Sequence, residues 1–339
     1  MATALMPSIV ESDLEREMIL DAALTPDRLE LTIFPTEKCN FRCVYCYEDF
    51  AIGRMSAKIV TGIKRLIDNR AVDLELLHLS WFGGEPLLAY PVLKELCTYA
   101  QDISSSFNFT FNSNITTNGY ALNEERLIEM TGFGIRHFQI SLDGDQAAHD
   151  TTRLRADGTG TFETIWSNLM LFNRLADAGQ LSGATVMLRV HMHPENIHSV
   201  EALLERIKAN LNPAHFSIYL KNVGHYGGAN DANVVIFKSK QDYIGIMHRL
   251  YETIAAYQLP PPEMPYVCYA SKANAFVIRA DGSLAKCTVA LADSANSIGQ
   301  ILETGELQLT DGKLAPWLHG LSSMVKSDLS CPVSNLPRV

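Results

Sequence analysis

The feature that most constrains the fold is a regular alternation of strand-like and helix-like segments. It begins with the apolar segment at residues 29–35 and ends with the strand-like segment at residues 215–220. Between these limits, six strand-like segments alternate with helix-like segments whose apolar residues recur at three- and four-residue spacing. Such an alternation indicates a parallel sheet with right-handed crossover connections. Periodicity alone leaves open whether this sheet forms a partial barrel or an open, doubly wound sheet. The other four expected strands are 74–82, 107–117, 136–144 and 183–192, and the expected helices are 56–70, 92–104, 123–133, 162–179 and 194–210.

The pattern changes on both sides of the alternating region. A helix capped by Ser12 is expected near the N-terminus, Ser56 is expected to cap the helix at 56–70, and Pro194 is expected in the first turn of the helix it opens. After a further helix at 239–257, the segment 258–266 contains four prolines and is interpreted as a stiff linker. The expected domains are a leader at 1–28, the alternating region at 29–225, a helix and linker at 226–265, and a small C-terminal domain at 266–339.

Composition and charge exclude several function classes. The chain has 28 Lys+Arg against 38 Asp+Glu and a net charge of −10, so we expect no nucleic-acid partner, because phosphate binding depends on Lys and Arg. The first residues lack the basic region of a secretory signal, and no run of about 18 apolar residues is present. We therefore expect a cytoplasmic protein without a membrane segment. In that compartment the seven cysteines are reduced thiols, for which metal binding or catalysis is favoured over disulfides.

Three of these cysteines, Cys39, Cys43 and Cys46, occur within the eight-residue stretch "CNFRCVYC". The stretch follows the first expected strand, at the end where parallel α/β folds carry their active sites. A structural zinc site uses four ligands, commonly as two close pairs. The loop could therefore be a zinc site completed by a distant residue. It could instead hold a cubane iron–sulfur cluster, one iron of which is left without a protein ligand and can bind a small molecule.

The stretch "CNFRCVYC" resembles the CxxxCxxC signature of the radical S-adenosylmethionine (radical SAM) superfamily. Further motifs follow the next expected strands in order: "GGEP" at 83–86, "TTNG" at 116–119 and "SLDG" at 141–144, with Arg153 twelve residues beyond Ser141. The resemblance covers nearly the whole chain. It implies a partial (β/α)6 TIM-like barrel that is open on one side, where a bulky substrate can enter.

The same resemblance implies two cofactors in the barrel, a 4Fe–4S cluster on Cys39, Cys43 and Cys46, and SAM bound to the open iron through its amino and carboxylate groups. Glu85 is then expected to accept a hydrogen bond from the SAM amino group. Ser141 and Arg153 are expected at the SAM carboxylate, which the guanidinium favours. The full set of implied SAM contacts is Tyr45, Gly83, Gly84, Glu85, Pro86, Thr117, Asn118, Ser141, Arg153 and Val190.

A second set of cysteines lies near the C-terminus. Cys268 is followed by "GSLAKC", which ends at Cys287, and this spacing resembles the Twitch/SPASM extension that carries auxiliary 4Fe–4S clusters in radical SAM enzymes. In "CPVSNLPRV", however, Ser334 stands where a second cysteine after Cys331 belongs. We expect one auxiliary cluster on Cys268, Cys287 and Cys331, with Ser334, substrate, solvent or nothing as the fourth ligand. The alternatives are a truncated or mutated chain that has lost this cluster, and three buried core thiols.

Other candidate residues are interpreted as structural. Cys97 has helical spacing and is expected in the core. His191, His193 and His198 do not share one face, so we expect hydrogen-bonded or exposed histidines and no metal site. The position after Cys287 is Thr288, where sulfatase-maturing radical SAM enzymes usually carry a catalytic Asp. A hydroxyl of ordinary acidity is a poor base near neutral pH, so this feature disfavours the sulfatase role.

The function implied by the resemblance is reductive cleavage of SAM, followed by hydrogen abstraction from a ribosomally made peptide during crosslinking or a related maturation step. The alternatives are a small-molecule radical dehydrogenase and a sulfatase-maturase-like enzyme. A more remote alternative is a non-catalytic iron–sulfur scaffold or sensor. Expected partners are a peptide or small-molecule substrate and an electron donor such as flavodoxin or ferredoxin. A separate peptide-recognition protein is also expected, because residues 1–28 are too short for a recognition domain.

Overall fold

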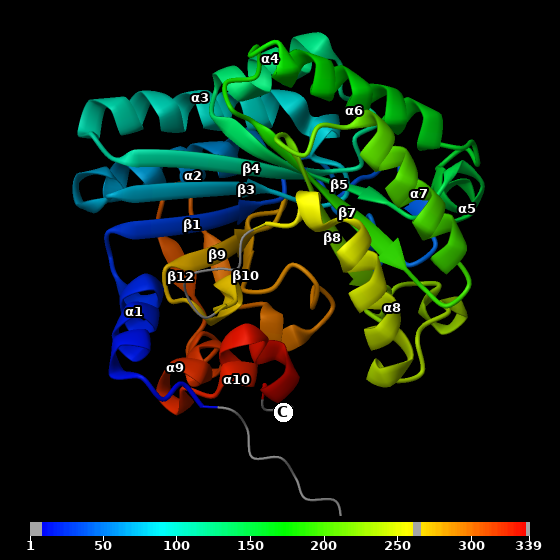
Figure 1. Cartoon of the computed structure of the whole chain (residues 1–339). Helices are drawn as coiled ribbons and strands as arrows, with labels where there is room; N and C mark the ends of the chain where they lie inside the picture. The colour runs from blue at the N-terminus through cyan, green and yellow to red at the C-terminus, as the bar shows by residue number, and fades with distance from the viewer. Residues whose placement is uncertain (1–8, 260–265, 337–339) are drawn as a thin grey trace, which may run out of the picture.

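The centre of the fold is a parallel sheet whose strands pair in chain order (Figure 1). The computed structural model describes residues 9–259 and 266–336 of the chain, apart from the side chains of Lys240 and Asn335. Each central strand is joined to the next by a crossover that contains a helix, which confirms the predicted parallel α/β architecture. The strands in spatial order are β1 (Arg28–Ile33), β3 (Leu76–Trp81), β4 (Thr110–Thr117), β5 (Ile135–Leu142), β7 (Thr185–Met192) and β8 (Phe216–Asn222). Because β8 lies at one edge of the sheet, the strands form a partial barrel that is open on one side.

The crossover helices cover one face of this sheet (Figure 1). Their apolar residues recur at helical spacing, as in Val60, Ile63 and Ile67 of α2, and these residues are buried against the sheet. Burying each such side chain contributes about 1.5–3 kcal/mol. The helices are α2 (Ala57–Arg70), α3 (Tyr90–Phe107), α4 (Glu124–Gly132), α6 (Phe162–Asp177) and α7 (Ile197–Asn210).

The two faces of the strands differ in polarity. Leu29, Leu31 and Ile33 of β1 are fully buried, whereas the alternate residues, such as Thr32, are only partly buried. Because successive side chains point to opposite faces, the apolar set packs under the helices and the polar set faces the inside of the barrel. The register continues this polar row, since Thr32 lies beside Ser80 of β3. The inside of the barrel is therefore the face that can bind a polar ligand.

The C-terminal segment extends the same sheet. β9 (Ala275–Ile278) pairs in parallel with β1, and β10 (Ser283–Ala285), β11 (Gly299–Ile301) and β12 (Leu307–Leu309) follow it as antiparallel strands. The sequence predicted a small C-terminal domain after residue 260, and in the structure this segment continues the barrel sheet through the β1–β9 pair. The prolines of the predicted linker, at 260–262 and 265, lie outside the described residues.

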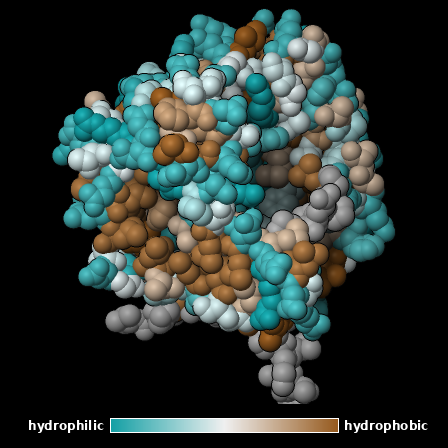
Figure 2. All heavy atoms as spheres, turned by 90° about the vertical axis from the view of Figure 1, so that its left-hand side faces the viewer, coloured by the Kyte–Doolittle hydropathy of each residue, from teal (hydrophilic) through white to brown (hydrophobic). Residues whose placement is uncertain are grey.

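The N-terminal helix α1 (Asp13–Leu24) packs against the C-terminal helices α9 (His319–Ser323) and α10 (Lys326–Ser330) (Figure 1). Ile19 and Ala23 of α1 form an apolar cluster with Leu321, Met324 and Leu329. The remaining longer helix is α8 (Lys240–Thr253), which follows β8. No helix in the part of the chain that the structure describes has the length and hydropathy needed to span a membrane. The face shown in Figure 2 mixes polar and apolar side chains and is hollowed near its centre.

Of the local predictions, the cap of α1 was confirmed and those for the starts of α2 and α7 were wrong. Ser12 caps α1 as predicted, by accepting the backbone N–H of Glu15 at 3.4 Å. Ser56 occupies the N-cap position of α2, but its side chain makes no capping hydrogen bond. Pro194 precedes α7, whose N-cap is Asn196, so it does not belong to the first turn. Within the barrel region the sequence also did not predict α5 (Gln146–Thr152) or the antiparallel pair of β2 (Phe41–Cys43) and β6 (Arg153–Arg155).

Candidate functional site

The carboxyl ends of the parallel strands and the loops that follow them surround one pocket. Because parallel strands place these ends at the same edge of the sheet, the four sequence motifs meet there although they are far apart in the chain. The predicted site residues in its wall are Cys39, Cys43, Tyr45, Cys46, Gly83, Gly84, Thr117, Asn118, Ser141 and Arg153. The pocket thus combines the thiols with the residues expected to contact SAM.

The cysteine loop is shaped by its own backbone and by β6. Cys43 lies opposite Arg153 in the β2–β6 pair, which places the guanidinium beside the thiols. The N–H of Phe41 donates to Sγ of Cys39 at 3.3 Å, and the N–H of Cys46 donates to the carbonyl of Cys43 at 3.1 Å. None of the three cysteines forms a disulfide.

The three thiols are close enough to influence one another. Burial is the main cause that raises the pKa of Cys39 and of Cys46 to about 12, and the nearby Cys43 thiol contributes to both shifts. Within the described ranges, no three His, Cys, Asp or Glu side chains converge tightly enough to hold a single metal ion. A cubane cluster spreads its cysteine ligands over three irons, so it requires a wider set of sulfurs than one zinc ion does. The loop therefore fits a cluster better than the zinc alternative.

Glu85 lies in the fully buried interior and is not part of the pocket wall. One carboxylate oxygen accepts the N–H of Leu87 at 3.0 Å and the hydroxyl of Thr117 at 2.7 Å, and the other accepts the N–H of Asn118 at 2.8 Å. Burial raises the pKa of Glu85, while these hydrogen bonds act to lower it. The structure therefore shows Glu85 joining the GGEP turn to the TTNG turn, and it does not place the carboxylate at a ligand. Pro86 begins the short helix η2 (Pro86–Ala89) and is also buried outside the wall.

The two glycines of the GGEP turn permit close contact between two backbone segments. Gly83 has a φ of +103°, and a Cβ atom there would lie 2.6 Å from the carbonyl oxygen of Thr36. A Cβ atom on Gly84 would collide with the carbonyls of Glu37 and Lys38. Gly83 and Gly84 are also among the expected SAM contacts, and both line the pocket. The structure shows that they pack the turn onto the segment leading into the cysteines.

A hydrogen-bonded network connects Arg153 to the SLDG turn. Nη1 of Arg153 donates to the hydroxyl of Tyr45 at 2.9 Å, and this hydroxyl donates to Oδ1 of Asp143 at 2.9 Å. Nδ1 of His191 donates to the same oxygen at 3.0 Å, and the hydroxyl of Thr152 donates to Oδ2 at 2.7 Å. Burial alone would raise the pKa of Asp143, but the hydrogen bond and charge of His191 and the charge of Arg153 hold this pKa well below its usual range. The buried Nε of Arg153 has no hydrogen-bond partner among the residues described, so this guanidinium retains a donor for an anionic ligand.

Val190 does not reach the pocket. Val190 is fully buried on the same face of β7 as Leu188, whereas Arg189 and His191 line the pocket. Since strand side chains alternate, a residue between two inward-facing neighbours points toward the helices. The apolar wall residue at this end is Val223, just after β8.

Sequence reasoning missed several polar residues of the pocket. The alternation along the strands would have found three of them at inward positions: Gln139 of β5, Arg189 of β7 and Lys221 of β8. Asn222 at the end of β8 also lines the pocket, and Asp143 of the SLDG turn is buried behind the wall, where it contacts Tyr45. His191 is hydrogen-bonded, and the side chain of His198 is fully exposed, as the sequence led us to expect for these histidines. Cys97 lies in the core, with its Sγ 3.8 Å from Oγ of Ser113.

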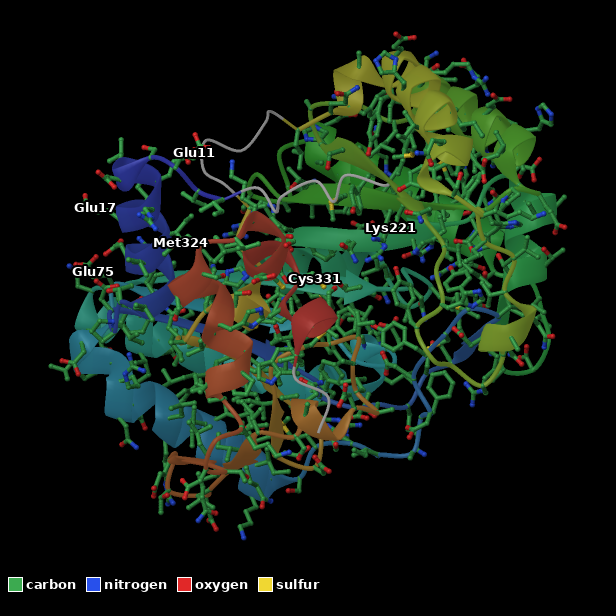
Figure 3. All side chains as sticks on the ribbon, turned by 90° about the horizontal axis from the view of Figure 1, so that it is seen from below. Glu11, Glu17, Glu75, Lys221, Met324 and Cys331 are labelled. Atoms are coloured by element: carbon green, nitrogen blue, oxygen red, sulfur yellow. The ribbon has the colours of Figure 1, made fainter. Side chains whose placement is uncertain are left out.

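The C-terminal cysteines form a second group. Cys268 precedes the short helix η5 (Tyr269–Ser271), Cys287 follows β10, and Cys331 lies between α10 and the short helix η8 (Pro332–Asn335). Burial raises the pKa of Cys268, and the thiols of Cys287 and Cys331 raise it further. The hydroxyl of Ser334 lies 3.5 Å from Sγ of Cys331. Seen from below, Cys331 and Lys221 lie near one another, so this group lies beside the barrel pocket (Figure 3).

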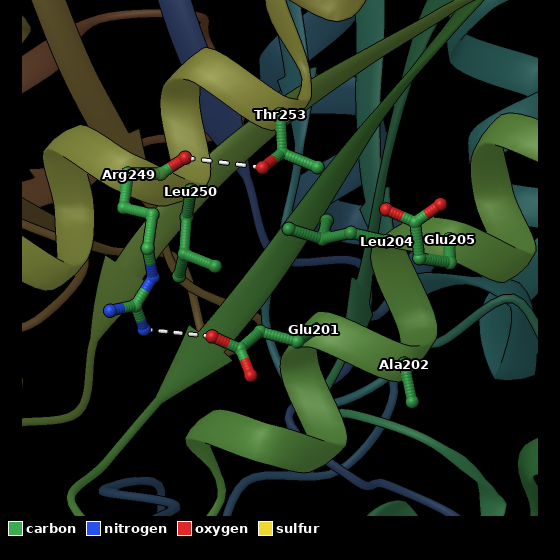
Figure 4. A pocket seen from close by; sticks show the side chains of 7 residues that line it. All are labelled: Glu201, Ala202, Leu204, Glu205, Arg249, Leu250 and Thr253. Atoms are coloured by element: carbon green, nitrogen blue, oxygen red, sulfur yellow. Dashed lines mark hydrogen bonds and ion pairs between the residues drawn. The ribbon is translucent and has the colours of Figure 1, made fainter.

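A separate cleft of about 350 Å³ lies between α7 and α8 (Figure 4). Its most polar contact is the ion pair between Arg249 and Glu201 at 2.7 Å. It contains no thiol and is lined in part by Leu204 and Leu250. Because it lacks any arrangement of reactive groups, we place the functional site at the pocket with the cysteine loop.

Comparison with known proteins agrees with this placement. The Radical SAM superfamily matches residues 33–207, a range that contains the cysteine loop, all three later motifs and Arg153. The chain therefore belongs to the radical SAM superfamily.

Two curated relatives illustrate the similarity. The PqqA peptide cyclase of Gluconobacter oxydans is 28% identical over 162 residues, which cover 48% of this chain and 41% of that protein. The cysteine-type anaerobic sulfatase-maturating enzyme of Clostridium novyi is 28% identical over 158 residues, which cover 43% of this chain and 41% of that protein. The chain thus aligns with less than half the length of these relatives.

The fold is also seen in solved structures. The structure of native anSMEcpe with bound AdoMet and Kp18Cys peptide superposes with a TM-score of 0.66 at 19% identity, covering 87% of this chain and 83% of that chain. This likeness supports the barrel fold and extends into the C-terminal segment.

Proposed function

We propose that this protein is a radical SAM enzyme that modifies a peptide. The observation that carries the proposal is the pocket itself, where three free thiols lie beside a buried arginine that retains an unpartnered donor. When bound, the 4Fe–4S cluster supplies one electron to SAM, whose C5′–S bond breaks to give the 5′-deoxyadenosyl radical that takes hydrogen from a C–H bond.

The residues of the chain have distinct roles in this proposal. Cys39, Cys43 and Cys46 would hold the cluster. Arg153 and Ser141 would bind the SAM carboxylate, because a guanidinium forms strong charge-assisted hydrogen bonds with such a group. Tyr45 would keep the guanidinium in place through its own bond to Asp143. The burial of this network excludes water from the charged groups and strengthens their interaction.

Two observations favour a peptide substrate. One similar relative is named as a peptide cyclase, and one similar structure was solved with a peptide bound. The residue after Cys287 is Thr288, whose hydroxyl hydrogen-bonds to the hydroxyl of Tyr269 at 2.9 Å. This hydroxyl pair contains no carboxylate that could serve as a base, so peptide crosslinking or a related maturation fits better than sulfatase maturation.

The C-terminal thiols would hold an auxiliary 4Fe–4S cluster. Their mutual proximity and the neighbouring Ser334 hydroxyl support Cys268, Cys287 and Cys331 as ligands, with Ser334 as a candidate fourth ligand. The location beside the pocket suits a group that accepts an electron when a crosslink closes. Turnover would require an external donor such as flavodoxin or ferredoxin, and peptide delivery would use a separate recognition protein. A cytoplasmic location belongs to the same proposal.

The test is an anaerobic reaction of the reconstituted protein with SAM, a reductant and short peptides encoded near its gene. We expect 5′-deoxyadenosine together with a peptide that has lost two hydrogen atoms, both measured by mass spectrometry. Such a loss would balance if the 5′-deoxyadenosyl radical took one hydrogen atom and the second left as a proton, with its electron passing to an oxidant such as the cluster that Cys268, Cys287 and Cys331 would hold. Cleavage of SAM that changes only small molecules, and never a peptide, would contradict the peptide assignment.

A further inference from the structure

Two cationic side chains line the pocket on the side formed by β7 and β8. Arg189 lies on β7, and Lys221 lies on β8 opposite His191. Both occupy inward-facing positions near the carboxyl ends of their strands. In the described part of the chain, neither side chain forms an ion pair or a hydrogen bond, and Nε of Arg189 is enclosed without a partner. This is unusual, since enclosed charges are ordinarily paired.

The positive charges of Arg189 and Lys221 repel each other. Lys221 pairs with His191, two residues beyond Arg189 on β7, so the two cationic side chains are diagonal neighbours on the inward face of the sheet. Two like charges held close together in a partly desolvated pocket raise the energy of the folded protein. An anion bound between them would relieve this repulsion and would satisfy the enclosed donor. The pair is therefore arranged as a receptor for an anionic group.

No carboxylate of the described residues forms an ion pair with Arg189 or Lys221. Tyr47 and His191 lie near Arg189, and neither side chain is an anion, since burial raises the pKa of the Tyr47 hydroxyl well above its usual value. Glu48 also lines the pocket, but among the described residues it forms no ion pair with Arg189 or Lys221, and Glu37, Arg279 and Asp49 are the charged groups near it. The C-terminal segment contributes Cys331, which approaches Lys221 (Figure 3).

Arg153 differs from this pair. Its guanidinium is anchored by Tyr45 beside the cysteine loop, at the position assigned to the SAM carboxylate. Arg189 and Lys221 have no such anchor, and Lys221 lies on the side of the pocket near Cys331 of the C-terminal segment. The pocket therefore contains two separate cationic positions, and one anionic cofactor group would occupy only one of them.

We infer that Arg189 and Lys221 bind a carboxylate of the substrate and so select an acidic peptide segment. This inference rests on the proposed function, because it names the chemistry of the peptide that the pocket accepts. Arg189 contributes a planar set of donors that can hold both oxygens of a carboxylate, and Lys221 adds a second charge. The carboxylate could belong to an Asp or Glu side chain or to a peptide C-terminus.

The test measures binding to the anaerobically reconstituted protein in the presence of SAM, so no turnover is needed. The probes are N-acetyl-Gly-Glu-Gly-amide, its Gln counterpart, and N-acetyl-Gly-Gly-Gly with a free C-terminus, each titrated by calorimetry. We expect at least one acidic peptide to bind tenfold or more tightly than the Gln peptide, because charge-assisted hydrogen bonds have about this strength. Which acidic peptide binds distinguishes a side-chain carboxylate from a terminal one.

Substitutions test whether Arg189 and Lys221 are the source of the preference for acidic peptides. Arg189→Gln and Lys221→Gln should each reduce the preference for the acid to less than threefold while SAM affinity stays within twofold of the parent. The matched control is Lys208→Gln, an exposed lysine of α7, which should keep the preference. If one variant fails to fold, the other and the peptide comparison in the parent still decide the result.

Three outcomes would overturn the inference: equal binding of acidic and Gln peptides, no binding of either acidic peptide, or loss of SAM affinity with retained acid preference. The last outcome would assign Arg189 to the SAM carboxylate. Failure of the proposed function is distinguishable, since it would appear as an absence of SAM cleavage in the parent, whatever peptide binds.

Discussion

The carboxylate of Glu85 accepts the backbone N–H of Asn118 at 2.8 Å, although the two residues belong to different turns. The other oxygen of Glu85 accepts the hydroxyl of Thr117 at 2.7 Å. Since Thr117 and Asn118 line the pocket and Glu85 does not, Glu85 supports the pocket wall through these neighbours. It is a positioning residue that fixes the TTNG turn against the GGEP turn.

Glu85→Gln should lower both stability and SAM affinity. The amide offers one acceptor atom in place of two, so a buried donor loses its partner, which costs about 1–3 kcal/mol of unfolding free energy. SAM affinity should fall about tenfold because Asn118 is no longer held in the wall. Denaturant unfolding and SAM titration measure the two effects. Glu75→Gln, at an exposed position before β3, serves as the control, and a Glu85→Gln protein as stable as this control would contradict the assignment.

Tyr45→Phe should weaken SAM binding while leaving the cluster in place. The change removes the hydroxyl that accepts from Arg153 and donates to Asp143. Without it the guanidinium is less well positioned, and we expect SAM affinity to fall about fivefold to thirtyfold, since one such bond contributes about 1–2 kcal/mol. Iron analysis should match the parent. Tyr219→Phe, a partly exposed tyrosine of β8, provides the matched control. Unchanged SAM affinity in Tyr45→Phe would show that the hydrogen bonds of Tyr45 do not contribute to SAM binding.

His149 should make the folded state sensitive to acid. Its Nδ1 accepts the N–H of Asp143 at 3.3 Å, and its Nε2 lies 3.0 Å from Oγ of Thr161, whose own proton is donated to the carbonyl of Arg153. These partners require a neutral ring with its proton on Nε2. Protonation would make Nδ1 a donor that faces the N–H donor of Asp143. Burial lowers the pKa of His149 from 6.5 to about 4.

The direction of the pH effect follows from this shift. Above pH 6.5, His149 is neutral in both the folded and the unfolded protein, and its contribution to the unfolding free energy is fully present. Below pH 6.5, the ring is protonated in the unfolded chain but stays neutral in the folded protein down to about pH 4. Unfolding free energy should therefore fall between these values, by about 2 kcal/mol at pH 5 from this residue. Denaturant unfolding across this range should give a shallower slope for His149→Gln than for the parent and for His198→Gln, at a fully exposed histidine. Identical slopes for both variants would show that His149 is not the group responsible.

The C-terminal cysteines should hold a second cluster that SAM cleavage does not require. Replacing Cys268, Cys287 and Cys331 by Ala should remove about four irons per chain, because a 4Fe–4S cluster contains four. Cleavage of SAM without substrate should continue, whereas peptide product should be lost. Ser334→Cys should keep the iron content and change the spectrum of this cluster, since a thiolate would stand beside Cys331. An unchanged iron content in the triple Ala variant would show that these three cysteines hold no cluster and are structural thiols.

The fold could be predicted because its signal is local and repeated. Each strand and each helix carries its own apolar spacing, and parallel strands joined by helices leave few topologies. The short elements β2, β6 and α5 have too few residues for such a signal, although β2 and β6 bring Arg153 beside Cys43. The four residues of β9 are all buried and show no alternation, so its pairing with β1, far away in the chain, could not be inferred.

The sequence predicted which residues meet at the pocket better than it predicted the contacts between them. The thiols, Ser141 and Arg153 were found through their motifs, because the motifs mark the ends of successive strands. The hydrogen bonds of Glu85 join segments from different parts of the sequence and depend on the packed structure. Val190 was placed in the pocket without regard to side-chain alternation, which assigns this face of β7 to Arg189 and His191.

The most direct test of the central claim measures 5′-deoxyadenosine formed from SAM by the anaerobically reconstituted and reduced protein. The claim is that Cys39, Cys43 and Cys46 hold the group that cleaves SAM in this pocket. We expect steady formation by the parent and by Cys97→Ala, in which only a buried core thiol is removed. Cys39→Ala, Cys43→Ala and Cys46→Ala should each abolish it, because the open iron requires all three anchors. Formation of 5′-deoxyadenosine at the parental rate by any of these three variants would contradict the account.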